Sequence, residues 1–335
     1  MDVIPSHVST VPALLRNRDI RVDVALIRVR PTDRSDEYSL GVISDYTEAL
    51  VACARVVVAE VDPRLPLTRG DAVIPASAIH HFVQAGGDII QISDPRPTDI
   101  EHGVGRRVAE LIPDRATVQL GVGGLSCAVA RALLGHKELG VHSGVVSDML
   151  VDMVESGAVT NAWKGIDAGV TVTGGLFGTD RLYAWADGNP AITMRSVEYT
   201  HDVAVMAKLH AFHSINFAIE VDISGQVNAE LAAGRYLGAV GGQVDFVRGA
   251  RYSKGGRSII ALPATTPNGS VSRIVASLAD RPVTTPRSDV DTVVTEYGVA
   301  DLRGVPFDER RRRLIAIAHP DHRDKLAKAD AIAAE

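Results

Sequence analysis

Helices and strands alternate along most of this chain, and the alternation limits the folds that it can adopt. We expect a helix over residues 100–112, a strand over 117–120, a tight turn and a second helix over 126–134. Further apolar runs predict strands over 139–142, 170–173, 215–221, 258–262 and 292–295, and another near residue 192. Strands separated by helices lie parallel, in a sheet with helices on both faces. The chain is therefore predicted to be an α/β protein with mainly parallel sheets.

A second group of elements is expected near the start of the chain. Residues 22–27 and the β-branched run 56–61 are predicted strands. Between them, a helix is expected from Ser44 to about residue 54, with Ser44 as its N-cap and an acidic first turn. The proline-containing segment 93–97 is typical of a connection between domains. We therefore expect two units, residues 1–95 and residues 96–335.

Composition narrows the class of protein. The chain has 335 residues and is 46% hydrophobic, which is enough for a large core. The net charge of −6 gives no reason to expect a nucleic-acid partner, and the four arginines at 310–313 are interpreted as the solvated face of a helix. Neither a secretory leader nor a membrane-spanning apolar run is evident. A cytoplasmic protein without a membrane partner is expected.

Two glycine-containing segments indicate an anionic or oxyanionic ligand. In the run 240–262, Gly241 and Gly242 follow Gly238 and precede a polar-capped element. Two consecutive glycines can aim their N–H groups at one negative oxygen. A second segment, residues 121–124, follows a strand and opens a helix, so it can present backbone amides to an anion. It lacks the spacing of a dinucleotide fingerprint, and a simple tight turn explains it equally well.

Single side chains offer weaker signals. Cys127 falls in the first turn of a helix, where a thiol pKa is lowered, although a small buried residue is the favoured interpretation. His142 ends a strand, and strand ends are where parallel sheets place ligands. Glu220 and Asp222 share one face of a strand as a possible acid–base pair, and Glu296, expected to join a strand to a helix, is another candidate carboxylate. Histidine and cysteine spacings predict no metal site.

Taken together, these segments resemble the acetyl-CoA hydrolase/transferase family, and especially its 4-hydroxybutyrate CoA-transferases. The matching stretches are SDYTEAL from residue 44, VVVAEVD from 56, VQLGVGG from 118, LGVHS from 139, INFAIEVDISGQVNAE from 215, VGGQVDFVRGA from 240, VVTEYGVADLRG from 293 and IAHPDHRDKL from 317. The resemblance covers nearly the whole chain. It implies tandem α/β domains of the NagB/RpiA/CoA-transferase type, assembled as a dimer or higher oligomer.

The resemblance also implies a reaction. Members of this family move CoA between carboxylic acids, or hydrolyse the thioester, through an active-site glutamate that forms an anhydride and then a glutamyl-CoA thioester. No tightly bound cofactor is implied, because the coenzyme A thioester is the substrate or ligand. By this resemblance Gln119 and Gly242 face the thioester oxygen. The loop positions implied to border that oxygen or the CoA are Gly121, Gly123, Gly241, Gly242 and Gln243.

The sequence departs from the family pattern in two places. The family's glutamate directly follows His-Ser in the LGxHS segment, where this chain has Gly144. A glycine has no side chain with which to form an anhydride. Family members also carry a stretch before the segment that here begins at residue 4, so the first domain is expected to be incomplete. An uncovered sheet edge or apolar face would result, and such surfaces usually find a partner.

Three hypotheses follow from these departures. The chain is an acyl-CoA-binding enzyme with altered chemistry at the thioester, with His142, Glu220 or Cys127 as the candidate base or nucleophile. Alternatively, it is a non-catalytic or complementing subunit of a CoA-transferase complex. In the third hypothesis it is a true CoA-transferase that uses another carboxylate, such as Glu220. The sequence leaves the acyl group and the acceptor open.

Overall fold

The computed structural model describes residues 3–329 and contains two main sheets. The smaller one, here called the small sheet, has the strand order β4-β2-β1-β3-β5. Its strands are β1 (Val24–Pro31), β2 (Glu37–Ser39), β3 (Val56–Val61), β4 (Val73–Pro75) and β5 (His81–Gln84). Helices α1 (Val11–Arg16) and α2 (Thr47–Cys53) accompany it. Its strands β1, β3 and β5 are parallel, whereas β2 pairs antiparallel with β1 and β4.

The larger sheet, here called the large sheet, has the order β18-β17-β15-β10-β6-β7-β8-β9. Its strands are β6 (Thr117–Gln119), β7 (Gly140–Val146), β8 (Thr171–Leu176), β9 (Ile192–Met194), β10 (Phe212–Phe217), β15 (Arg257–Ala261), β17 (Thr292–Thr295) and β18 (Gly298–Asp301). All neighbouring pairs are parallel except β17 with β18. The prediction of an α/β fold with mainly parallel sheets is confirmed.

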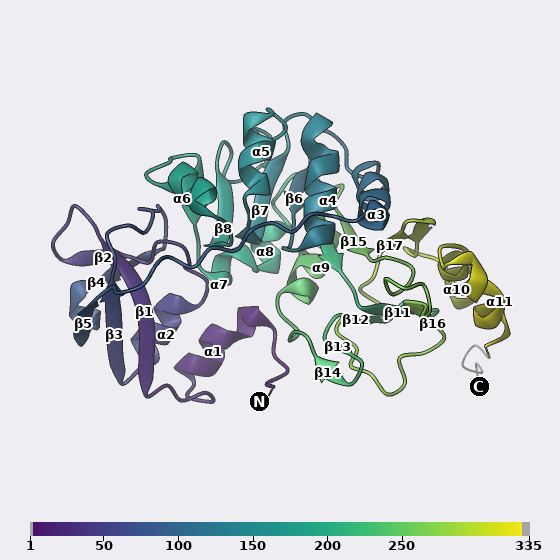
Figure 1. Cartoon of the computed structure of the whole chain (residues 1–335), viewed down its shortest axis with the longest axis horizontal. Coiled ribbons are helices and arrows are strands. Elements are labelled where there is room, and N and C mark those ends of the chain that lie inside the picture. Colours follow the sequence, from purple (N-terminus) through teal and green to yellow (C-terminus); the bar gives the residue numbers. More distant parts are fainter. Residues whose placement is uncertain (1–2, 330–335) are drawn as a thin grey trace.

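Helices cover both faces of the large sheet (Figure 1). Helices α3 (Asp99–Ala109), α4 (Gly124–Ala132) and α5 (Met149–Glu155) lie on one face. The opposite face carries α8 (Val203–Met206) and α9 (Gln243–Tyr252), which follow α6 (Asp180–Ala186) and α7 (Val197–Thr200) in the chain. Burial on both faces explains why β8, β15 and β17 are near-continuous apolar or small-residue runs.

The chain order places a topological switch point in the middle of the large sheet. From β6 the chain proceeds through β7, β8 and β9 to one side, and β10 then returns to the other side of β6 and continues to β15. The loops that leave β6 and β10 therefore diverge at adjacent strand ends. Such divergence opens a crevice beyond the carboxyl ends of the strands, where open α/β sheets bind ligands. Gln119 lies at the end of β6, and Asn216 lies near the end of β10.

Smaller elements complete the C-terminal part. A three-stranded sheet consists of β11 (Glu220–Asp222), β12 (Val227–Asn228) and β16 (Ile274–Val275). A two-stranded sheet pairs β13 (Leu231–Ala232) with β14 (Arg235–Tyr236). Helix α10 (Phe307–Ala316) is followed by α11 (Pro320–Lys328). Within residues 3–329, no helix combines the length and hydropathy needed to cross a bilayer.

Several local expectations are wrong. Glu296 is followed by the antiparallel strand β18 rather than by a helix. Ser44 does not cap α2, which begins at Thr47 after an N-cap residue that makes no side-chain hydrogen bond. The strand expected over 215–221 breaks into β10 and β11. Arg310 is not simply solvated: its guanidinium donates to four backbone carbonyls, including those of Ser224 and Leu302, so it joins α10 to the loops beneath it.

One face of the small sheet is uncovered in this chain. Alternate residues of β1 point to opposite faces. On one face Ala25 and Val29 are buried, whereas on the other Val24 is 50% and Leu26 77% exposed. Val83 of β5 is 52% exposed, and the strand register places it on the same side as Leu26. The expectation of an uncovered apolar face in residues 1–95 agrees with this arrangement.

Candidate functional site

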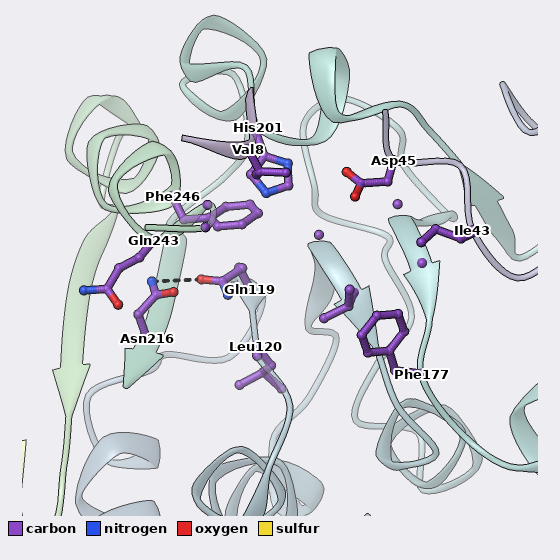
Figure 2. Close-up of a pocket in the computed structure, with 17 residues that line it drawn as sticks. Val8, Ile43, Asp45, Gln119, Leu120, Phe177, His201, Asn216, Gln243 and Phe246 are labelled. Carbon is purple, nitrogen blue, oxygen red and sulfur yellow. Dashed lines mark hydrogen bonds between the residues drawn. The ribbon is translucent and has the colours of Figure 1, made fainter. Parts of the chain in front are cut away.

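A cavity of about 280 Å³ opens at the switch point of the large sheet. Its wall combines the ends of β6, β7, β8 and β10 with the start of α9 and with a few residues from the first part of the chain (Figure 2). The lining residues are Val8, Ile43, Asp45, Gln119, Leu120, Gly121, Gly144, Val145, Gly174, Gly175, Phe177, His201, Asn216, Gly241, Gly242, Gln243 and Phe246. Two of these residues, Asp45 and His201, carry an acidic or basic side chain.

Gln119 and Asn216 join the two diverging strands at the floor of the cavity. The Asn216 amide donates to Gln119 Oε1 at 3.2 Å (Figure 2). Gln119 takes part in this bond through its oxygen, so the bond does not use the two hydrogens of its own NH2 group. Both side chains are almost fully buried. The pair therefore offers a preorganised amide donor where a carbonyl oxygen of a ligand can lie.

The start of α9 contributes backbone donors to the same cavity. Gly242 is the N-cap of α9, and the helix begins at Gln243. The first amides of a helix have no intrahelical partner and attract negative charge. Gly241 has φ +61°, a conformation that favours glycine, and its carbonyl accepts from the Val8 amide at 3.0 Å. The Gln243 side chain is bonded to Thr285 Oγ1 at 2.9 Å, so the backbone rather than this side chain is free to face a ligand.

His201 packs between Gly144 and Gly242. A Cβ atom at Gly144 would lie 2.9 Å from His201 Cε1, and one at Gly242 would lie 2.3 Å from His201 Nε2. Neither glycine has positive φ, so close approach of the imidazole, and not backbone conformation, requires a glycine at both positions. The ring is only 7% exposed and lies against Phe246, with 4.4 Å between centroids. The volume beside Gly144 is thus filled by a side chain from elsewhere in the chain.

The Thr200 hydroxyl holds the His201 ring in place. It lies 2.8 Å from His201 Nδ1 and 3.2 Å from the Ser196 carbonyl. The hydroxyl has one hydrogen, which either neighbour can accept, so these contacts fit both tautomers of the ring. Nε2 lies on the side of Gly144 and Gly242. Burial, with a smaller effect of nearby His142, lowers the pKa of His201 to about 3, so the ring is neutral.

Among the described residues that line the cavity, Asp45 alone carries a carboxylate. It lies just before α2, and in Figure 2 its carboxylate points into the cavity on the side of His201. Among the described residues its side chain has neither a hydrogen-bond donor nor a cation as partner. Burial raises the pKa of the Asp45 carboxyl to about 6.

The structure brings together six of the positions considered from the sequence. Gln119, Gly121, Gly144, Gly241, Gly242 and Gln243 all line the cavity. Gly123 lies instead in a neighbouring cavity of about 400 Å³, with Glu101 and Phe217.

The three residues proposed as base or nucleophile, His142, Cys127 and Glu220, lie outside the cavity wall. His142 is fully buried, its Nε2 lies 2.9 Å from the Thr200 carbonyl, and burial lowers its pKa to about 3. Cys127 is buried, and desolvation, reinforced by Asp94, raises its thiol pKa to about 12, which is opposite to the shift expected at a helix start. Glu220 lies 3.1 Å from Arg281 and accepts from the Asn228 amide at 3.1 Å.

Sequence reasoning missed Asp45, His201 and Asn216 as site residues. Asn216 belongs to a segment that carried the family resemblance, and its place near a strand end was a usable signal. Asp45 was instead predicted to belong to the first turn of the helix expected from Ser44. Nothing local marked His201, which follows the short helix α7. Within residues 3–329 there is no group of three or more His, Cys, Asp or Glu side chains arranged to hold a metal ion.

Comparison with known proteins places this site in a family. Residues 178–330 match the model of the acetyl-CoA hydrolase/transferase C-terminal domain. The 4-hydroxybutyrate coenzyme A transferase of Clostridium kluyveri is 41% identical over 326 residues, covering 97% of this chain and 76% of that protein. The acetyl-CoA hydrolase of Saccharomyces cerevisiae is 31% identical over 239 residues, covering 68% of this chain and 41% of that protein.

A solved relative supports the same assignment at the level of structure. The crystal structure of 4-hydroxybutyrate CoA-transferase from Porphyromonas gingivalis superposes with a TM-score of 0.86 at 39% identity, covering 95% of this chain and 77% of that one. CoA-transferases act on CoA thioesters, and a cavity with backbone donors at a switch point suits such a ligand. By its sequence, fold and relatives, this chain belongs to the acetyl-CoA hydrolase/transferase family.

Proposed function

We propose that this protein binds an acyl-CoA and carries out chemistry at its thioester without forming a glutamyl-CoA intermediate at residue 144. The resemblance implies a nucleophilic glutamate where this chain has Gly144. The observation that carries the proposal is the packing of His201 against that glycine, since the volume beside Gly144 is filled rather than vacant. The donors of Gln119 and of the α9 start remain available to polarise a thioester carbonyl.

The acyl group then passes to water, to a nucleophile within the substrate, or to an external acceptor. These outcomes are hydrolysis, cyclisation and acyl transfer. The Clostridium and Porphyromonas relatives are 4-hydroxybutyrate CoA-transferases and the yeast relative is an acetyl-CoA hydrolase. Acetyl-, butyryl- and 4-hydroxybutyryl-CoA are therefore the first substrates to test.

The test uses the full chain with each acyl-CoA, alone and with acetate as acceptor. Products are separated by chromatography, and the protein is treated with hydroxylamine and weighed by intact mass spectrometry. Turnover without a covalent protein adduct is expected. No turnover of any acyl-CoA, with or without acceptor, would overturn the proposal. An adduct trapped on Glu220 would favour a transferase that uses that carboxylate instead, although its ion pair with Arg281 argues against a free nucleophile.

The uncovered face of the small sheet favours a second candidate, a subunit that acts within a larger assembly. Val24 and Leu26 on β1 and Val83 on β5 are exposed apolar side chains on this face, and side chains of this kind are often buried between subunits. A second chain would then cover residues 1–95 and supply the missing catalytic group. Activity of a monodisperse homo-oligomer, measured without any other protein, would contradict this candidate.

A further inference from the structure

The backbone around Asp45 is held on both sides of the residue. The Asp45 amide donates to the Gly174 carbonyl at 3.3 Å, and its carbonyl accepts from Val197 at 2.8 Å. The preceding residue, Ser44, also donates to Gly174, at 2.8 Å. The segment is thereby fixed between β8 of the large sheet and α7. Asp45 has φ +40°, a conformation that costs energy outside glycine and is concentrated at functional sites.

The side chain of Asp45 does not cap the helix that follows it, which is the usual role of an aspartate at this place. The N-cap of α2 is Tyr46, and no side chain caps this helix. Arg195 adjoins Ser196, the residue that forms a β-bridge with Asp45, but its guanidinium is engaged elsewhere: it lies 3.2 Å from Asp71 and over the ring of Tyr199. A half-buried carboxylate that neither caps nor pairs has no structural reason to face a cavity.

The position of Asp45 relative to Gly144 suits attack on a ligand in the cavity. Gly174 on β8 lies beside Gly144 on β7, and a Cβ built at Gly174 would lie 2.9 Å from the Gly144 carbonyl and 3.8 Å from Asp45 Cα. Asp45 therefore stands next to the strand position where the family's nucleophile is implied. Figure 2 shows the Asp45 carboxylate pointing toward the side of the cavity where the His201 ring lies.

We propose that Asp45 is the general base that activates water for hydrolysis of the acyl-CoA thioester. This inference rests on the proposed function. As the water oxygen forms a bond to the thioester carbon, one water proton passes to the Asp45 carboxylate, and the oxyanion is held by the Gln119 and α9 donors. Collapse breaks the carbon–sulfur bond, and the proton leaves Asp45 for the CoA thiolate. The products are the free carboxylic acid and CoA, with Asp45 regenerated.

His201 acts in this scheme as a positioning residue. In the tautomer that carries its hydrogen on Nδ1, Nε2 accepts the second hydrogen of the water while Asp45 takes the first. Its low pKa keeps it neutral at all pH values above about 3, so it does not compete as the base. The ionisable groups carried by the segments around Asp45, besides His201, are Glu48 on α2, Glu198 on α7, which is paired with Arg16, and the Arg195–Asp71 pair.

The inference predicts a defined pH dependence. A general base works when deprotonated, so hydrolysis should rise with pH through the Asp45 pKa, about 6, and level off above it. Asp45→Asn should lower kcat by roughly 100-fold or more and remove this limb, because a positioned base contributes about 10²–10⁴-fold. Asp45→Glu keeps the carboxylate and should retain more activity than Asp45→Asn.

The experiment compares the full-length protein with Asp45→Asn, Asp45→Glu and the matched control Glu48→Gln, which makes the same chemical change on an exposed face of α2. Released CoA is measured by chromatography, because Cys53 is a free, partly exposed thiol that would react with a thiol reagent. Incorporation of ¹⁸O from labelled water into the acid confirms hydrolysis. Affinity for a non-hydrolysable thioether analogue of the acyl-CoA shows that the variant still binds.

The outcomes separate this inference from the proposed function. Loss of the pH limb and of kcat in Asp45→Asn, with analogue affinity unchanged and Glu48→Gln like the wild type, supports Asp45 as the base. Wild-type hydrolysis in Asp45→Asn overturns the inference and leaves the proposed function standing. A hydroxylamine-trapped adduct on Asp45 also overturns it, in favour of direct attack. Failure of the wild-type protein to bind or turn over any acyl-CoA overturns the proposed function itself.

Discussion

The two sheets of this molecule contribute different chemistry to one cavity. The large sheet, covered on both faces, supplies its glycines and neutral donors: Gln119, Asn216 and the start of α9. The segment beside the small sheet, whose outer face is uncovered, supplies Asp45, the one carboxylate among the described lining residues. In the mechanism proposed above, polarising a carbonyl and activating a nucleophile are therefore separate tasks. The first is assigned to the switch point of the large sheet, and the second depends on how residues 3–46 are held against it.

Gly242→Ala should have the largest effect, because it acts on the most tightly packed contact of the large-sheet wall. Its Cβ would lie 2.3 Å from His201 Nε2, and overpacking of this kind costs about 3 kcal/mol of unfolding free energy. Denaturant unfolding measures the loss. Gly238→Ala is the matched control, because a Cβ there meets nothing within 4 Å. If Gly242→Ala is as stable as the control, the close packing of His201 described above is wrong.

Gly144→Glu tests whether the filled volume can be reopened, and its effect should be smaller. The new Cβ would lie 2.9 Å from His201 Cε1, so we expect a loss of about 1–2 kcal/mol in stability. Combining it with His201→Ala should recover part of that loss, giving a favourable coupling in a double-mutant cycle. Only the double variant is expected to give a hydroxylamine-trapped adduct at residue 144. An adduct in the single variant would show that His201 moves aside freely.

Asp45→Asn should change stability in the opposite direction. Its folded pKa, about 6, lies above the unfolded value of 3.8, so ionisation costs stability that is intact below pH ~4 and lost as pH rises through about 6. Removing the charge should therefore stabilise the protein by about 1 kcal/mol at pH 7–8, after discounting for solvent screening of a half-buried group. Unfolding curves at pH 4 and pH 8 measure this. An equal effect at both values would mean that the Asp45 pKa is not raised.

Sequence patterns predicted the elements better than the site. The strand over residues 56–61 is found where it was expected, because a β-branched run needs no distant information. Asp45 was interpreted as part of a helix start, since an acidic residue near an N-terminus usually has that role. In the structure the Asp45 amide instead donates to the carbonyl of Gly174, which lies far along the chain. The fit of His201 against Gly144 likewise joins residues that no local pattern connects.

Leu26→Ala should have the smallest effect on stability. It tests whether the outer face of the small sheet is exposed, in contrast to the covered large sheet. Leu26 is 77% exposed, so truncation should change the unfolding free energy of the isolated chain by less than about 0.5 kcal/mol. Val29→Ala, on the buried face of the same strand, should cost about 2 kcal/mol. A stable dimer that buries this face would make the cost at Leu26 depend on protein concentration, because association stabilises the folded state by mass action. Unfolding at two concentrations distinguishes these cases. A large, concentration-independent loss at Leu26 would mean that its side chain is buried within the chain itself, and the contrast between the two sheets would then fail.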